Sequence, residues 1–138
     1  MKSVLKVSAV CLYDPAGRLL TVRKQGTGKF MHPGGKPEPG ETAAEAGVRE
    51  LAEEVGLHIA PDLLEPMGVW TGAAANESGM DIEATVFTAP GTWDPTAIHP
   101  AAEIAELRWL DLSQASDYTD LAPLLTEYVI PRLSSPTP

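Results

Sequence analysis

Three glutamates stand close together in a segment rich in alanine, glutamate and leucine. Glu50, Glu53 and Glu54 are spaced i, i+3, i+4, a spacing that clusters them on a helix. Like charges in this arrangement repel one another, so a sequence shaped only for stability would place lysines among them. Carboxylate oxygens are natural ligands of Mg²⁺, which also keeps positions open for water and phosphate. The spacing therefore indicates either a cation site or, as the alternative, a solvated acidic helix face.

The helix that must carry these glutamates is marked at both ends. Thr42 is a suitable N-cap, Glu45 three residues later makes a capping box, and Gly56 is placed to end the helix after Val55. We predict a helix over 42–55. Its apolar face is expected to consist of Ala44, Val48, Leu51 and Val55, with the three glutamates roughly opposite.

An unusual loop leads directly into this helix. Residues 33–41 read PGGKPEPGE, and glycines allow a backbone to approach an anion or ion closely. Taken alone, such a loop is simply a turn. Together with the helix, it offers a place where phosphate and metal could meet.

The remaining organisation predicts one domain over residues 1–133, followed by a disordered tail over 134–138. We expect the first two strands to form a hairpin. The final helix is expected to carry Leu121, Leu124, Leu125 and Tyr128 on one stripe. The expected strands cover 4–13, 18–23, 64–71, 82–88 and 107–112, and the final helix covers 121–133. This mixture favours an α/β or α+β sandwich.

Composition narrows the range of partners. The 138 residues have a formal net charge of -9, which repels a nucleic-acid backbone and predicts no nucleic-acid partner. No apolar run approaches the roughly 20 residues of a membrane span. No signal peptide is visible, so the cytoplasm is the expected location. Cys11 lies in an apolar run and is expected to be a buried small hydrophobe.

Loop and helix together match a known pattern. Gly35, Glu41 and the segment 49–57 (RELAEEVGL) fit G-x5-E-x7-R-E-U-x-E-E-x-G-U at every specified position, where U is aliphatic. The chain thus resembles the Nudix hydrolases, and weaker similarity extends over most of its length. The resemblance implies an α/β/α sandwich with a mixed β-sheet. It also implies hydrolysis of a nucleoside diphosphate linked to another group, with Mg²⁺, or alternatively Mn²⁺, as cofactor.

The resemblance also implies roles for particular residues. The expected metal ligands are Glu50, Glu53, Glu54, the main-chain carbonyl of Gly34, and Glu103. Glu53 and Glu54 are the expected central pair, and Glu106 competes with Glu103 for its place. Glu50 is the first choice as general base and Glu53 the second. Glu41 and Arg49 are expected to form a buried or half-buried ion pair that holds the loop against the helix. Arg23, Gly35 and Lys36 are the expected substrate-binding residues.

The substrate is less well defined by the sequence. A short chain favours a nucleoside triphosphate as substrate, cleaved to the monophosphate and pyrophosphate. ADP-ribose or a nucleotide sugar is the alternative substrate. The alternative function is that of a non-catalytic nucleotide-binding sensor. Isopentenyl diphosphate isomerases are another enzyme class with the same fold. Cys11 does not lie in the sequence context of their catalytic cysteine, so this class is disfavoured. A homodimer is consistent with the resemblance.

Residues that could contact the base are also left open. Candidates are Asp117 and Asp120, of which Asp120 is expected rather to cap the last helix, and the aromatic residues Trp70, Trp93, Trp109 and Tyr118, each expected rather in packing. His32 occupies a position that is often apolar in the family, where it either contacts substrate or is a neutral loop residue.

Overall fold

Two β-sheets form the centre of the protein in a computed structural model, which describes residues 3–74 and 79–134. The larger sheet has the order β3-β1-β5-β4, built from β1 (Ser3–Cys11), β3 (Gly34–Gly35), β4 (Glu65–Ala73) and β5 (Met80–Thr88). β1 and β5 run parallel, whereas β1–β3 and β4–β5 are antiparallel, so the sheet is mixed. The smaller sheet pairs β2 (Leu19–Lys24) with β6 (Ile104–Leu110).

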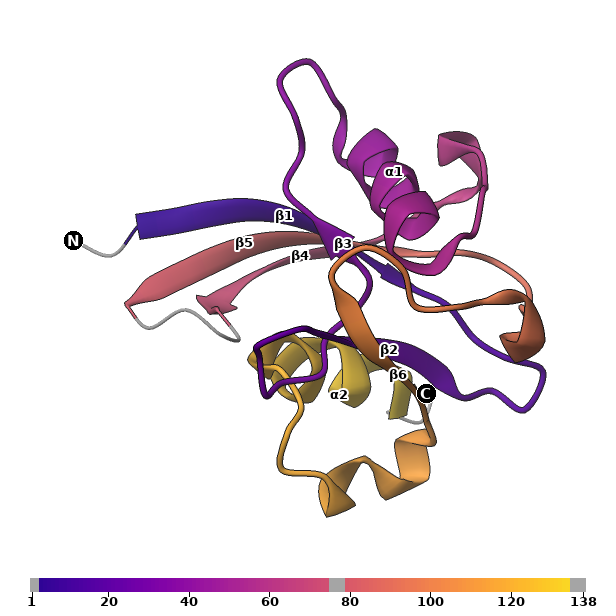
Figure 1. Cartoon of the computed structure of the whole chain (residues 1–138). Coiled ribbons are helices and arrows are strands. Elements are labelled where there is room, and N and C mark those ends of the chain that lie inside the picture. Colours follow the sequence, from indigo (N-terminus) through magenta and orange to yellow (C-terminus); the bar gives the residue numbers. More distant parts are fainter. Residues whose placement is uncertain (1–2, 75–78, 135–138) are drawn as a thin grey trace.

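Helices cover opposite faces of this β layer (Figure 1). On one side lies α1 (Ala43–Val55); on the other, a π-helical segment over Leu124–Val129 continues into α2 (Ile130–Ser134). Shorter 3₁₀ turns cover Pro61–Leu63, Pro95–Ala97 and Leu112–Asp117. The α/β/α sandwich and mixed sheet predicted above are confirmed. Within the described residues, no helix is long and apolar enough to cross a membrane.

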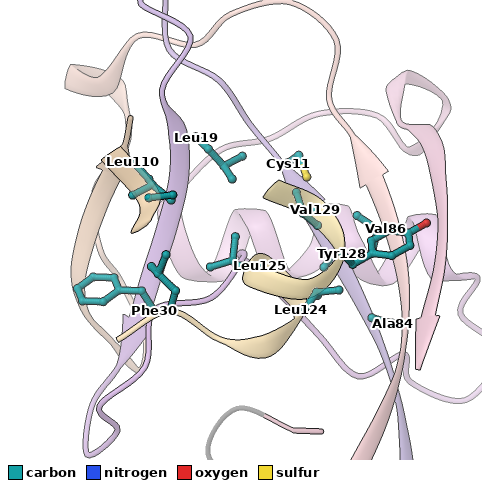
Figure 2. Close-up of a cluster of buried hydrophobic side chains, with 13 residues drawn as sticks. Cys11, Leu19, Phe30, Ala84, Val86, Leu110, Leu124, Leu125, Tyr128 and Val129 are labelled. Carbon is teal, nitrogen blue, oxygen red and sulfur yellow. The ribbon is translucent and has the colours of Figure 1, made fainter. Parts of the chain in front are cut away.

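Two apolar clusters hold the layers together, and β1 contributes to both. Ala9 and Cys11 belong to the cluster under the C-terminal helix, whereas Val10 and Leu12 belong to the cluster under α1, as the alternation of a strand requires. In Figure 2, Leu125 and Val129 of the C-terminal helix lie among side chains from both sheets. Leu51 and Val55 anchor α1 in the second cluster.

The predicted helix over 42–55 is confirmed together with its caps. The Thr42 hydroxyl accepts from the Glu45 N–H at 3.1 Å, and the Glu45 carboxylate accepts from the Thr42 N–H at 2.8 Å. Gly56 adopts a left-handed φ of 74°, which glycine accommodates without strain. The predicted faces need correction, because Glu54 is buried at 1% exposure while Ala44 and Val48 are only half-buried. Glu54 follows Leu51 by three residues and precedes Val55, so helical spacing places it on the buried side.

The predicted hairpin of the first two strands is largely wrong. Tyr13 and Leu19 form an isolated antiparallel bridge, but β2 takes β6 as its partner along its whole length. The other strands are found within a few residues of their predicted positions.

The closing helix also differs from its prediction. It starts near Leu124 rather than at Leu121, and it ends at Ser134, which was expected in the tail. Residues 135–138 of that tail lie outside the described residues. Asp120 does not cap this helix, because both of its carboxylate oxygens accept from Arg108, at 2.8 and 3.0 Å.

Candidate active site

An arginine–glutamate pair fixes the glycine-rich loop to α1. Arg49 donates through Nε to Glu41 Oε2 at 2.7 Å and through Nη2 to Glu41 Oε1 at 3.1 Å. A further bond runs from Nη2 to the Lys36 carbonyl at 2.9 Å, so one guanidinium holds two points of the loop. The side chains of Arg49 and Glu41 are 24% and 16% exposed, which is the half-buried pair expected from the sequence.

The same guanidinium also lies near three further carboxylates, the first being Glu38, whose Oε1 is 3.3 Å from Nε. Arg49 Nη1 lies 2.6 Å from Glu50 Oε1 and 3.3 Å from Glu53 Oε1. Its bond to Glu41 is the largest of the contacts that raise the pKa of Arg49, and the same bond lowers the pKa of Glu41. The guanidinium therefore neutralises part of the like charge that made this cluster unusual in the sequence.

Glu54 approaches the loop from beneath. Its Oε1 accepts a hydrogen bond from the Gly34 N–H at 3.1 Å, while its Oε2 is buried without a partner. Burial raises the pKa of Glu54 to about 8, a rise that the Gly34 N–H opposes and the nearby Glu50 charge reinforces. A buried carboxyl with one unused oxygen is a group that a bound cation would satisfy.

Both glycines make close contacts with neighbouring elements. A Cβ on Gly35 would lie 2.7 Å from the Glu50 carboxyl carbon, and a Cβ on Gly34 would collide with the Ser8 carbonyl oxygen. The loop thus passes directly over α1 and β1: at Gly34 the backbone of β1 leaves no room for a side chain, whereas at Gly35 the Glu50 side chain would have to move.

The site opens into a cavity of about 490 Å³. Charged side chains gather around one part of it, namely Lys24, Lys36, Glu38, Arg49, Glu50 and Glu103. Apolar side chains line another part, including Leu5, Val7, Ile82 and Leu124. A polar region beside an apolar one suits a ligand with a charged group and a less polar one.

The structure brings most of the expected residues to this cavity. Gly34, Gly35, Lys36, Arg49, Glu50 and Glu103 line it. Glu54 lies directly behind Gly34, while Glu41 reaches the site through Arg49. Glu53 does not line the cavity, and its side chain is 53% exposed beside Arg49. Glu106 is likewise absent from the lining, which favours Glu103 between the two competitors.

Arg23, an expected substrate-binding residue, does not line the cavity. Arg23 donates to Glu106 at 2.8 Å and to the Thr27 carbonyl at 2.9 Å, outside the cavity lining. Its neighbour Lys24 lines the cavity instead, with Nζ 3.4 Å from Glu103 Oε1. The register of β2 against β6 shifts between Arg23 and Lys24, so no simple strand pattern in the sequence separates the two residues.

The residues considered for base contact are engaged elsewhere. The Arg108 guanidinium stacks between Phe30 and Tyr118, at 3.7 and 4.3 Å from their ring centroids, while Asp120 binds its edge. The tryptophans Trp70, Trp93 and Trp109 pack against the two cores, and none of the described cavity-lining residues is aromatic apart from His32. Asp117 ends a 3₁₀ turn away from the lining.

His32 and Cys11 are both buried. His32 lines the cavity at 4% exposure, and burial lowers its pKa to about 4, so the ring is neutral. Cys11 is fully buried, and desolvation raises the pKa of its thiol to about 12. The expected reading of Cys11 as a small core residue agrees with this burial, since a thiol held so far from ionisation is inert.

The metal-ligand set expected from the sequence is not preassembled. Among residues 3–74 and 79–134, no three His, Cys, Asp or Glu side chains are grouped closely enough to hold a metal ion. Arg49 Nη1 instead donates to both Glu50 and Glu53. The donor chemistry nevertheless fits a hard cation, because Glu54 Oε2 is buried and unpartnered beside Glu50.

Comparison with known proteins assigns this fold and site to a class. The NUDIX domain model matches residues 2–132, so the chain belongs to the NUDIX family, and its intact glutamate-rich segment is that of a Nudix hydrolase. The MutT protein of Methanosarcina mazei Go1 has a similar structure, with a TM-score of 0.75, 20% identity and 98% of each chain covered. The NUDIX domain of Shewanella oneidensis NrtR, solved with ADP ribose, has a TM-score of 0.74 and 16% identity, covering 97% of this chain and 90% of that one.

A relative identified by sequence is named as an isomerase rather than a hydrolase. The isopentenyl-diphosphate Delta-isomerase of Nocardia farcinica (strain IFM 10152) is 34% identical over 110 residues, which cover 74% of this chain. The chain spans 61% of the length of that relative. Nudix hydrolases generally use divalent metal ions.

Proposed function

We propose that the protein is a Mg²⁺-dependent pyrophosphohydrolase that cleaves a diphosphate bond in a nucleoside diphosphate derivative. The favoured substrate is a nucleoside triphosphate, and the products are the monophosphate and pyrophosphate. The observation that carries this proposal is the placement of Glu50 and the buried Glu54 beside Gly34 and Gly35, at the charged part of the cavity. Mn²⁺ is the alternative cofactor.

Lys24 and Lys36 supply the local positive charge that an acidic protein needs to bind a polyanion. The net charge of -9 repels a diphosphate at long range, whereas cations lining the cavity attract it at short range. Lys24 therefore replaces Arg23 as our proposed phosphate-contacting residue on β2. Gly35 contributes by allowing close approach of the backbone.

Glu50 is the proposed general base. Its carboxylate lines the cavity, whereas that of Glu53, the second choice, is exposed outside it. Glu50 would take a proton from an attacking water, the water oxygen would bond to phosphorus, and the bridging P–O bond would break. A divalent ion, held by Glu50, Glu54, the Gly34 carbonyl, Glu53 and Glu103, would lower the pKa of bound water and offset the diphosphate charge. Arg49 and Glu41 position the loop.

The isopentenyl diphosphate isomerase activity of the Nocardia relative is the second candidate. The fully buried, un-ionised Cys11 is unsuited to the thiol chemistry that the resemblance implies for those isomerases. The motif glutamates Glu50, Glu53 and Glu54 are all retained, which likewise argues against a non-catalytic sensor. We therefore place hydrolysis of a nucleotide first, with ADP-ribose and nucleotide sugars as alternative substrates.

A substrate panel tests this proposal. Purified protein is incubated with Mg²⁺ and nucleoside triphosphates, ADP-ribose, nucleotide sugars and isopentenyl diphosphate, with an EDTA control, and the products are separated by chromatography. EDTA-sensitive release of nucleoside monophosphate and pyrophosphate supports the proposal. Isomerisation of isopentenyl diphosphate without nucleotide cleavage would overturn it.

A further inference from the structure

The imidazole of His32 is buried at the site without using its hydrogen-bonding groups. The residue is 4% exposed, and neither Nδ1 nor Nε2 has a partner among the described residues. Burying an unpartnered polar group costs stability, so a fold shaped only for stability would favour leucine or phenylalanine here. We therefore expect a bound molecule to provide hydrogen-bond partners for the two ring nitrogens.

The backbone around His32 is fixed on both sides. Met31 exchanges two hydrogen bonds with Val22, at 2.8 and 2.9 Å, and the Pro33 carbonyl accepts from the Val10 N–H at 3.0 Å. Gly34 pairs with Ala9 in an antiparallel register, so His32, two residues before Gly34, lies beyond this pair toward the C-terminal end of β1. His32 therefore forms a buried and rigidly held part of the cavity lining.

The neighbouring lining residues offer no comparable group. Ala9, Ala122 and Leu124 are apolar. The hydroxyl protons of the two other uncharged polar residues in the described lining are already committed, Ser8 to the Ala43 carbonyl at 2.7 Å and Thr27 to the Lys24 carbonyl at 2.8 Å. An occupant of this part of the cavity would therefore find its uncharged donor–acceptor group in His32.

We propose that His32 is a specificity-determining residue that hydrogen-bonds the heterocyclic base of the bound nucleotide. A neutral imidazole presents one N–H donor and one nitrogen acceptor, which the edge of a base can match. Because both nitrogens are enclosed, the contact requires the ring to turn toward the cavity. This inference rests on the proposed nucleotide substrate. An isopentenyl chain could pack against the apolar lining, but it would leave the His32 nitrogens without a hydrogen-bond partner.

Two substitutions separate a substrate contact from a structural role. His32→Leu removes the buried unpaired nitrogens, so it is expected to raise the Tm while raising KM for the nucleotide about tenfold, with a smaller change in kcat. His32→Gln keeps a donor and an acceptor and is expected to recover part of the KM. Inhibition by inorganic pyrophosphate, which has no base, should stay unchanged in both variants. A lowered Tm with equal weakening of nucleotide and pyrophosphate would show a structural histidine instead.

Side-chain NMR tests the contact without catalysis. The chain has three histidines, and exposed His58 and His99 serve as references for His32. In metal-free buffer, ring ¹⁵N shifts are followed while AMP, GMP, CMP or UMP is added, with ribose 5-phosphate as the control. We expect at least one nucleotide to shift the His32 resonances while those of His58 and His99 stay unchanged. Ribose 5-phosphate should shift none of them.

The possible failures are distinguishable. If a nucleotide is cleaved or bound while the His32 resonances and the His32→Leu KM stay unchanged, the His32 inference is wrong and the proposed function stands. If no nucleotide is bound or cleaved, the proposed function fails and this inference fails with it.

Discussion

Glu54 and Gly34 are joined by a hydrogen bond of 3.1 Å from the backbone N–H of Gly34 to the Glu54 carboxylate. This bond links the last turn of α1 to the glycine pair of the loop. Only one oxygen of Glu54 is used, and the other is buried without a partner. The junction of loop and helix is thus built around a carboxyl that is costly to ionise.

The first prediction concerns stability and pH in metal-free buffer. Because the folded-state pKa of Glu54 is about 8 and its ordinary value is 4.5, the folded protein binds the extra proton between these pH values. The contribution of Glu54 to the free energy of unfolding is therefore greatest below about pH 4.5 and falls as pH rises toward 8. Glu54→Gln should flatten this fall by an amount on the order of a few kcal/mol, measured by chemical denaturation from pH 5 to 8.5.

Glu53→Gln is the matched control for that measurement. Glu53 lies one residue away and its side chain is 53% exposed, so Glu53→Gln removes a neighbouring carboxylate without removing a buried one. Identical slopes for wild type and Glu54→Gln would contradict the assigned burial of the carboxyl.

The second prediction concerns the close approach of the loop to α1. A methyl group on Gly35 would lie 2.7 Å from the Glu50 carboxyl carbon, so Gly35→Ala must displace either the loop or the proposed base. We expect kcat to fall by roughly 10²-fold while the protein remains folded, because positioning errors near 1 Å cost about this much. Gly28→Ala is the control, since a methyl group there meets nothing within 4 Å. Equal activities of the two variants would show that the Gly35–Glu50 contact is unimportant.

The third prediction distinguishes two adjacent cations. Lys24→Met should raise KM for a nucleoside triphosphate about tenfold, because Lys24 lines the cavity and its loss removes a charge-assisted contact to phosphate. Arg23→Met should change KM little, since Arg23 is bound to Glu106 and the Thr27 carbonyl. Steady-state kinetics at fixed ionic strength compares them. A larger effect in Arg23→Met would restore the original sequence-based assignment.

Local patterns in the sequence predicted much of the fold, and tertiary contacts account for what they missed. The caps of α1 follow from residue types at fixed spacing, whereas the Arg49–Glu41 pair was predicted from the resemblance to the Nudix hydrolases. The pairing of β2 with β6 joins residues at least 80 positions apart, and no local pattern records it. Nearby turn residues instead suggested a hairpin with β1.

The site was predicted in its membership more fully than in its geometry. The resemblance made Glu53 and Glu54 the central pair of metal ligands beside Glu50, whereas the structure buries Glu54, half-buries Glu50 and exposes Glu53. Helical spacing from Leu51 could have indicated the burial of Glu54. The competition of Arg49 for Glu50 and Glu53 could not be foreseen, because it depends on the conformation of a long side chain.

The most direct test compares pyrophosphohydrolase activity in the wild type and Glu50→Gln. Nucleoside triphosphates are supplied with Mg²⁺, with and without EDTA, and circular dichroism verifies folding. The proposed function predicts EDTA-sensitive release of monophosphate and pyrophosphate by the wild type, with kcat lowered about 10²- to 10⁴-fold in folded Glu50→Gln. Wild-type turnover by Glu50→Gln would contradict the role of Glu50, and the absence of nucleotide cleavage by the wild type would contradict the proposed function itself.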